Sequence, residues 1–303
     1  MPAPVHDQES PAVQASRSAL ESAACLRIVA SDGVPLFCRR FDPSGAVKGS
    51  VVLCPGVRSH SGWYGWSGRR LAEAGWRVWF ADRRGTGANG GPRGDAPHAD
   101  RLLADVRHVV RLARRRDPET PVTLGGISWG GKLAATLAAE DGLCDALLLL
   151  TPGLRARVRV GPVQAAAVRA AVRSGRGRTL VRVPLEDARL FTAENDFVRF
   201  IEDDPLTLDA VTLRFTAASL DLDQRAKAAV ERLSVPTYTA LAGRDEIVDN
   251  PATRRLLGRC GTEDLTIRTF PAARHTLEFE PNREAIFDLL IDWLNRLPQG
   301  AMR

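Results

Sequence analysis

The 303-residue sequence predicts an α/β fold with a mostly parallel, doubly wound sheet and an inserted helical cap. Short apolar runs alternate with segments of helical spacing, which is the pattern of strands joined by crossover helices. The alternation stops over residues 153–230, where Ala/Arg-rich helical patterns and an acidic segment replace it. An insertion of this length is too long for a passive loop in a compact domain, so we expect a cap or lid.

The first part of the chain supplies strands and helices in the expected order. The runs CLRIVA and PLFCRRF flank a Ser-Asp-Gly turn and predict a hairpin of strands at 25–41. The apolar run GSVVLCPG predicts a strand that is buried on both faces. It is followed by an expected helix at 63–74, a strand at 77–82 and a helix at 99–116.

The rest of the chain repeats this alternation on both sides of the insertion. PVTLGGIS predicts a strand, WGGKLAATLAAE a helix and ALLLLTPG the next strand. PTYTALAGRDEIVD and LTIRTFPAARH predict two more strands, with helices near 251–259 and 282–296. We therefore expect a core of residues 25–152 and 231–303, a cap of residues 153–230, and a site at the carboxyl ends of the strands.

The N-terminus and the cysteines bear on the cellular compartment. Residues 1–24 have neither a basic leader nor an apolar segment, and they predict a flexible N-terminal extension in place of a secretory signal. No apolar run approaches the roughly 20 residues that span a bilayer. The five cysteines are scattered without metal-site spacing, so we expect no metal, no disulfide framework and a cytoplasmic protein.

The formal net charge of +6 is unevenly distributed. Residues 155–182 contain eight arginines and no acid. This segregation fits a solvated helix face, a site for an anionic substrate, or contact with an anionic membrane surface. Because no stacking aromatic residues accompany the arginines, we do not expect nucleic acid as a partner.

The segment GGISWGGKL (125–133) carries two overlapping motifs. From Gly126 it reads G-x-x-x-x-G-K, as in a phosphate-binding loop, but Leu133 stands where a Ser or Thr ligand of magnesium belongs. It also reads G-x-S-x-G, which exposes Ser128 on a strained turn between a strand and a helix. The small residues Gly126 and Gly130 suit such a turn, so Ser128 is the candidate nucleophile.

A serine nucleophile needs a histidine to accept its proton and a carboxylate to orient that histidine. Of the five histidines only His275 follows Ser128, and it comes directly after a predicted strand. The segment LAGRDEIVDN offers the acid at the end of another strand. Asp245, at the strand tip, is the preferred acid, while Asp249 precedes Asn-Pro and fits a helix cap better.

The loop after VVLCPG offers further candidate site residues. The backbone N–H of Val57 in this loop and that of Trp129, next to the nucleophile, are expected to bind the oxyanion of acyl transfer. His60 is expected to face the pocket or to brace the loop. We expect Trp63 and Tyr64 to line the substrate pocket with it.

Residues 85–90 read G-x-G-x-x-G, a pattern also found in dinucleotide-binding proteins. Such a site requires the glycines to run directly from a strand into a helix. Here DRR precedes the glycines and GPRG follows them, so they lie inside a long loop. We therefore expect no organic cofactor.

Together these segments resemble the α/β-hydrolase superfamily, and specifically its monoglyceride lipase/lysophospholipase-like branch. The resemblance rests on PGVRSHSGWY, WFADRRGTGANGGPRG, GGISWGGK, DDPL, GRDEIVDN and ARHTLEFE. It implies an α/β-hydrolase fold with Ser128, Asp245 and His275 as the catalytic triad and residues 153–230 as the lid. The branch usually has His-Gly where this chain has Pro-Gly, but the N–H needed for the oxyanion comes from the following residue.

The sequence thus predicts a serine hydrolase that cleaves a carboxylic ester of an apolar acyl group through an acyl-enzyme on Ser128. The expected substrate is a monoacylglycerol-like or lysophospholipid-like small molecule, and an arginine-rich cap would favour an anionic one. The alternatives are an acyl thioesterase, an amidase or peptidase on the same triad, and a non-hydrolytic binding protein of this fold. An apolar stripe of the cap could cover the acyl chain or pack on the core: Val163, Ala166, Ala167, Ala170 and Val172.

Overall fold

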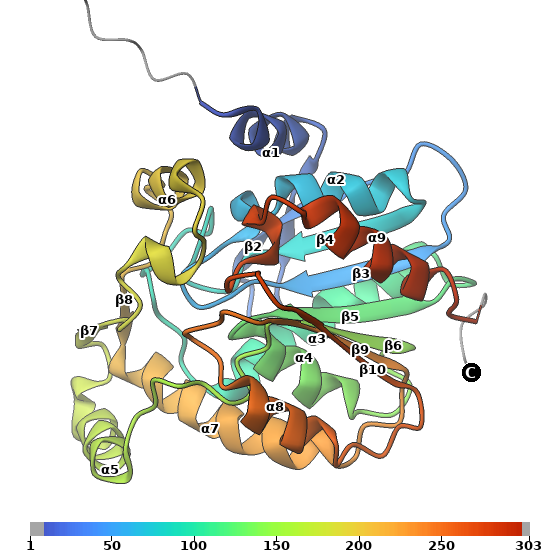
Figure 1. Cartoon of the computed structure of the whole chain (residues 1–303). Helices are drawn as coiled ribbons and strands as arrows, with labels where there is room; N and C mark the ends of the chain where they lie inside the picture. The colour runs from blue at the N-terminus through green and yellow to red at the C-terminus, as the bar shows by residue number, and fades with distance from the viewer. Residues whose placement is uncertain (1–8, 299–303) are drawn as a thin grey trace, which may run out of the picture.

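The computed structural model describes residues 9–298, which form an eight-stranded sheet with helices around it (Figure 1). The strand order is β1-β2-β4-β3-β5-β6-β9-β10. β2 is antiparallel to β1 and β4, whereas all other neighbours in this sheet are parallel, so the predicted mostly parallel, doubly wound sheet is confirmed. The strands are β1 (Ala24–Val29), β2 (Pro35–Phe41), β3 (Gly49–Cys54), β4 (Trp76–Ala81), β5 (Val122–Ile127), β6 (Ala146–Leu150), β9 (Thr237–Ala242) and β10 (Leu265–Phe270).

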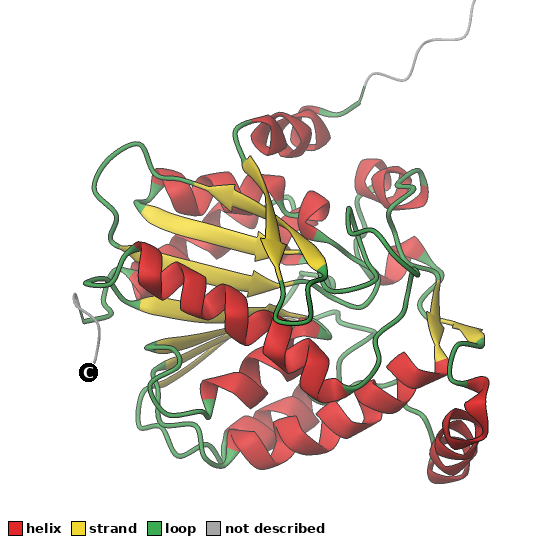
Figure 2. Ribbon diagram, turned by 180° about the vertical axis from the view of Figure 1, so that it is seen from behind, coloured by secondary structure: helices red, strands yellow, loops and turns green. Residues whose placement is uncertain are grey.

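Helices cover both faces of this sheet (Figures 1 and 2). α2 and α9 pack together on one face, while α3, α4, α7 and α8 lie on the other. β3, β5 and β9 are buried along their whole length because both faces are covered, which explains their continuous apolar runs. The helices are α1 (Pro11–Glu21), α2 (Gly65–Glu73), α3 (Ala99–Arg116), α4 (Gly130–Ala138), α5 (Pro162–Ala171), α6 (Asn195–Glu202), α7 (Leu213–Val230), α8 (Asn250–Leu257) and α9 (Arg283–Leu294).

The prediction of a flexible N-terminal extension is wrong for Pro11–Glu21, because these residues form the helix α1. Pro11 suits the first turn of a helix, and Val13, Ser16 and Ala19 form a buried face against α2. Arg283 of α9 donates to Ser16 Oγ at 3.2 Å and thereby ties α1 to the core. Residues 1–8, which belong to the same prediction, lie outside the described part of the chain.

The insertion after β6 contains helices, as predicted, but also a small second sheet. Strands β7 (Leu180–Arg182) and β8 (Ala210–Thr212) pair antiparallel beside α5 and α6. α7 packs along α4 and also contacts α3, so this last part of the expected cap belongs to the helix layer of the core (Figure 1). The reason is that α7 has a buried face, which includes Phe215, Leu222 and Ala226. In the described residues, no helix has the length and apolar character needed to cross a membrane.

Candidate active site

Ser128 lies on a sharp turn between β5 and α4. Its backbone φ is 51°, a left-handed value that few residues other than glycine adopt. A Cβ atom on Gly126 would lie 2.6 Å from the carbonyl oxygen of Gly130, and one on Gly130 would lie 2.7 Å from that of Pro55. Side chains at these two positions would collide with backbone, so the glycines of the G-x-S-x-G motif are what allows this turn.

The structure brings Ser128, His275 and Asp245 together at the carboxyl ends of β5, β10 and β9. His275 Nε2 lies 2.7 Å from Ser128 Oγ, and His275 Nδ1 lies 2.8 Å from Asp245 Oδ2. Since an ionised carboxylate only accepts, Nδ1 carries the proton and Nε2 accepts from the serine hydroxyl. All three side chains are buried, which shields these hydrogen bonds from water.

The surroundings of Asp245 keep its carboxyl ionised. Burial alone would raise its pKa, but the electrostatic interaction and hydrogen bond with His275 and two backbone N–H groups lower it below its ordinary value. These N–H groups belong to Ile247 and Val248 and donate to Asp245 Oδ1 at 2.8 and 2.9 Å. Asp249, the other candidate acid, accepts from the N–H of Ala252 at the start of α8 and is therefore a helix cap.

The two expected oxyanion donors flank the nucleophile. Trp129 follows Ser128 directly. Val57 follows Gly56, and an ideal Cβ atom on Gly56 would lie 3.4 Å from Ser128 Cβ. Within the described chain, the N–H groups of Val57 and Trp129 donate no hydrogen bond. The proline that replaces the usual histidine leaves this arrangement intact, since Gly56 N–H donates to Ser59 Oγ at 2.9 Å and the next amide remains available.

Arg83 supports the Val57 loop, a role that the sequence did not suggest. Its guanidinium donates to the carbonyl oxygen of Val57 at 3.0 Å and lies over the rings of Trp129 and Phe215, at 5.0 and 4.5 Å from their centroids. Burial lowers the pKa of Arg83 to about 9, although Asp82 opposes the shift. A guanidinium that joins the two expected oxyanion residues limits their relative movement.

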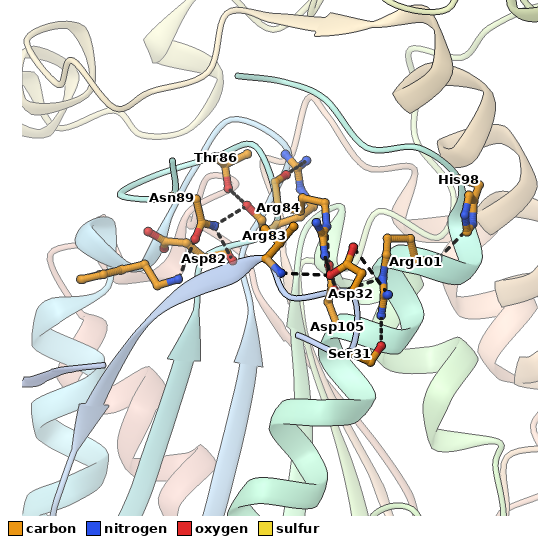
Figure 3. A network of polar contacts seen from close by, with 12 residues as sticks. Ser31, Asp32, Asp82, Arg83, Arg84, Thr86, Asn89, His98, Arg101 and Asp105 are labelled. Carbon is orange, nitrogen blue, oxygen red and sulfur yellow. Dashed lines mark hydrogen bonds and ion pairs between the residues drawn. The ribbon is translucent and has the colours of Figure 1, made fainter. Parts of the chain in front are cut away.

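The G-x-G-x-x-G glycines lie in a loop, as expected, and polar contacts fix this loop from within (Figure 3). Asn89 donates to the carbonyl oxygens of Asp82 and Arg83, each at 2.9 Å. Arg84 pairs with Asp105 of α3 at 2.9 Å. The next helix along the chain, α3, begins only at Ala99, so the glycines do not lead directly into a helix.

Lys132, the lysine of the alternative phosphate-loop interpretation, is bound to side chains of α7. Its Nζ lies 2.7 Å from Asp223 of α7 and 3.4 Å from Ser219 Oγ. A lysine held by a carboxylate is not placed to neutralise a phosphate next to Ser128. Among the residues described, no group of three or more His, Cys, Asp or Glu side chains could hold a metal ion.

His60, Trp63 and Tyr64, which we expected in the substrate pocket, are buried in the packing beneath the cap. His60 Nδ1 accepts from Gly62 N–H, so the proton is on Nε2, which donates to Asp204 Oδ2 at 2.8 Å. Trp63 Nε1 donates to the same oxygen at 2.8 Å. His60 and Trp63 thereby fasten the cap to the loop, because Asp204 belongs to the cap segment DDPL, while the Tyr64 hydroxyl donates to Ser59 Oγ within the loop.

A largely apolar cavity of about 530 Å³ opens beside the expected oxyanion donors. Val57, Trp129 and Ile247 line its core side. The cap side differs from the stripe predicted from the sequence, since α5 contributes Gln164 and Val168 while Val163 is 82% exposed. Further apolar lining comes from the segments around β7 and β8: Val181, Val183, Pro184, Leu185, Val211 and Leu213.

This fold, with a serine turn after β5 that meets a histidine and an acid from later strands, defines an α/β-hydrolase. The chain belongs to the Hydrolase_4 family, described as serine aminopeptidase, S33, which matches residues 45–282. It falls in the monoacylglycerol lipase-like branch of these hydrolases, as the sequence motifs indicated.

Known proteins of this branch are similar over most of the chain. The monoacylglycerol lipase of Mycolicibacterium smegmatis is 26% identical over 86% of this chain and 93% of that protein. The crystal structure of a Paleococcus ferrophilus monoacylglycerol lipase has a TM-score of 0.76 and 24% identity, and covers 86% of this chain and 98% of the other. The crystal structure of a soluble variant of the Saccharomyces cerevisiae monoglyceride lipase, in complex with a substrate analog, has a TM-score of 0.80 and 16% identity. It covers 98% of this chain and 99% of the other.

Proposed function

We propose that this hydrolase cleaves carboxylic esters of apolar acyl groups through an acyl-enzyme on Ser128. The observation that carries the proposal is the hydrogen-bonded series Ser128, His275 and Asp245 beside an apolar cavity. Its relatives named monoacylglycerol lipase and monoglyceride lipase support an ester as the substrate.

In the first half-reaction, His275 Nε2 takes the proton of Ser128 while Oγ attacks the ester carbonyl carbon. The carbonyl oxygen becomes negative, and the N–H groups of Val57 and Trp129 stabilise it. When the tetrahedral species collapses, the bond to the alcohol oxygen breaks and His275 gives its proton to the leaving alcohol. The acyl group remains on Ser128 as an ester.

In the second half-reaction, water takes the place of the alcohol. His275 accepts a proton from the water, whose oxygen attacks the acyl carbon. Collapse of the second tetrahedral species returns the proton to Ser128 Oγ and releases the carboxylic acid. Asp245 stabilises the imidazolium in both halves and remains ionised throughout.

The charges around the cavity favour an ester over an N-terminal peptide. An aminopeptidase must hold the substrate's ammonium group close to the scissile carbonyl, which requires a carboxylate in the pocket. The apolar cavity is lined by Arg159 and Arg182 and, within the described chain, by no acidic side chain. Arg182 pairs with Glu186 at 2.8 Å, but Arg159 makes no ion pair with a described residue and would repel such an ammonium group, so the family description does not decide the substrate of this chain.

The proposal is tested with p-nitrophenyl esters of short and medium acyl chains and with a fluorophosphonate probe. We expect hydrolysis by the wild type, loss of turnover in Ser128→Ala with retained fold, and labelling that peptide mapping places on Ser128. A folded wild type that neither turns over esters nor reacts with the probe would indicate a binding protein. Faster turnover of matched thioesters or amides than of esters would reassign the substrate class.

A further inference from the structure

A second cavity, of about 500 Å³, lies next to the apolar one and is lined in part by α5. It is bounded by α4, α5 and α7 and by the segment that follows β6. The two cavities are neighbours, because six residues line both of them: Ala156, Val158, Arg159, Val160, Thr216 and Ser219. A ligand that spans both cavities would place an apolar part in the first and another part in the second.

The wall of this second cavity is strongly basic. It contains five cationic side chains and one acidic side chain, Asp223. Asp223 pairs with Lys132 at 2.7 Å, which leaves four cations without a counter-charge. These four, whose side chains make no ion pair or hydrogen bond to another described residue, are Arg155, Arg159, Arg169 and Lys227.

Several arginines elsewhere in the described chain pair with an acid, whereas the arginines that line this cavity do not. Arg84 pairs with Asp105 and Arg107 with Glu140, for example. Like charges gathered around one cavity repel one another, and this repulsion opposes folding until an anion enters. Guanidinium groups suit phosphate and carboxylate because their N–H donors match two oxygen atoms at once.

The basic cavity begins close to the candidate nucleophile. Lys132 comes four residues after Ser128, which is about one turn along α4. Ser219 stands at the boundary, since it accepts from Trp129 Nε1 at 2.8 Å and from Lys132 Nζ at 3.4 Å. Trp129 thus lines the apolar cavity while Lys132 lines the basic one.

We propose that the basic cavity binds a phosphate or carboxylate group of the substrate. The preferred substrate is then an ester that carries an anion at some distance from the scissile bond, with an apolar stretch between them. This inference rests on the proposed ester hydrolase and specifies its substrate class. The anion belongs either to the leaving alcohol, as a phosphate, or to the far end of the acyl chain, as a carboxylate.

Two matched pairs of esters distinguish these sources. 1-Octanoylglycerol 3-phosphate is compared with 1-octanoylglycerol, and p-nitrophenyl hydrogen suberate with p-nitrophenyl octanoate. For at least one pair we expect the wild type to have a kcat/KM about tenfold or more higher with the anionic member, the size of one charged hydrogen bond. The preference should decrease with added salt, because salt screens partly exposed charges.

The double variant Arg159→Gln/Arg169→Gln should reduce this ratio of anionic to neutral kcat/KM by about tenfold. The matched control is Arg173→Gln/Arg176→Gln, which removes two exposed arginines that line neither cavity. The control should keep the wild-type ratio. Equal loss of the ratio in both double variants would mean that only the overall charge matters, and would overturn the site.

Calorimetric measurement of ester binding to Ser128→Ala, at ester concentrations below the micellar range, separates this proposal from the proposed function. We expect the anionic member of the favoured pair to bind about tenfold more tightly than the neutral one, and the Arg159→Gln/Arg169→Gln changes to abolish the difference. Turnover of neutral esters with no anionic preference in rate or binding would refute the basic site and leave the ester hydrolase standing. Tighter binding of the anionic ester with no turnover of any ester would support the basic site and refute the ester hydrolase.

Discussion

The exchange Asp245→Asn tests whether the carboxylate fixes the proton position on His275. The orientation of the new side chain follows from its neighbours. The N–H groups of Ile247 and Val248 donate to Oδ1 at 2.8 and 2.9 Å, and only the amide oxygen of an asparagine can accept from them. The amide NH₂ of residue 245 must therefore face His275 Nδ1, now at 2.8 Å from Oδ2.

An NH₂ group in this place reverses the tautomer of His275. Nδ1 has to accept a hydrogen bond, so the proton moves to Nε2, the atom that lies 2.7 Å from Ser128 Oγ. A protonated Nε2 cannot take the serine proton. We expect kcat to fall about 10⁴-fold, or about 5.5 kcal/mol of transition-state stabilisation, with KM much less affected.

The assay is steady-state hydrolysis of p-nitrophenyl butyrate, with circular dichroism to confirm that the variant is folded. Asp249→Asn is the matched control, because asparagine caps a helix about as well as aspartate and Asp249 only caps α8. The control should keep wild-type kinetics. If folded Asp245→Asn retained more than about a tenth of the wild-type kcat, the tautomer argument would be refuted.

Three further predictions concern the turn, the oxyanion loop and a buried acid. Gly126→Ala places a Cβ 2.6 Å from a backbone atom, so its free energy of unfolding in urea should be about 2 kcal/mol lower than that of the wild type. The control Gly45→Ala, whose Cβ would have no neighbour within 4 Å, should leave the free energy of unfolding nearly unchanged. Arg83→Met removes the hydrogen bond to Val57 O, and kcat should fall about tenfold with little change in KM; an unchanged kcat would show that the loop holds its position alone. Burial raises the pKa of Glu278 from 4.5 to about 7, so the folded state binds more protons than the unfolded state between these values. This group should therefore lower the wild-type free energy of unfolding by roughly 3 kcal/mol as pH rises from 4.5 to 7. Urea unfolding at both pH values should show that Glu278→Gln removes this decrease.

The features that the sequence revealed are those set by local chemistry. The turn at Ser128 needs small residues two positions away on each side, and this requirement is visible as G-x-S-x-G. Asp249 could be separated from Asp245 because a helix start beginning with Asn-Pro is also a local signal. Buried parallel strands likewise appear as continuous apolar runs, so the core sheet was predictable.

The features that the sequence concealed depend on contacts between distant segments. Asp204 lies 141 residues from Trp63, and no pattern near either residue indicates their hydrogen bond. Arg83 lies in a loop where an arginine would ordinarily be solvated, and only the fold places the rings of Trp129 and Phe215 against it. The helix α1 was missed because its stability comes from packing on α2, which a weakly apolar segment does not reveal.

The same distinction divides the cap into a fixed part and a variable part. Where the cap meets the oxyanion loop, Arg58 donates to Leu185 O and Leu208 O, and Asp204 accepts from His60 and Trp63. These are buried or partly buried hydrogen bonds of charged groups, and a substitution that breaks one leaves an uncompensated polar group behind. The cavity walls on α5 and its flanking segments are built instead from partly exposed side chains without such bonds. Exchanges in that wall can therefore alter which substrate fits while the geometry around Ser128 is preserved, so the cavity lining is where the specificity of this hydrolase has to be sought.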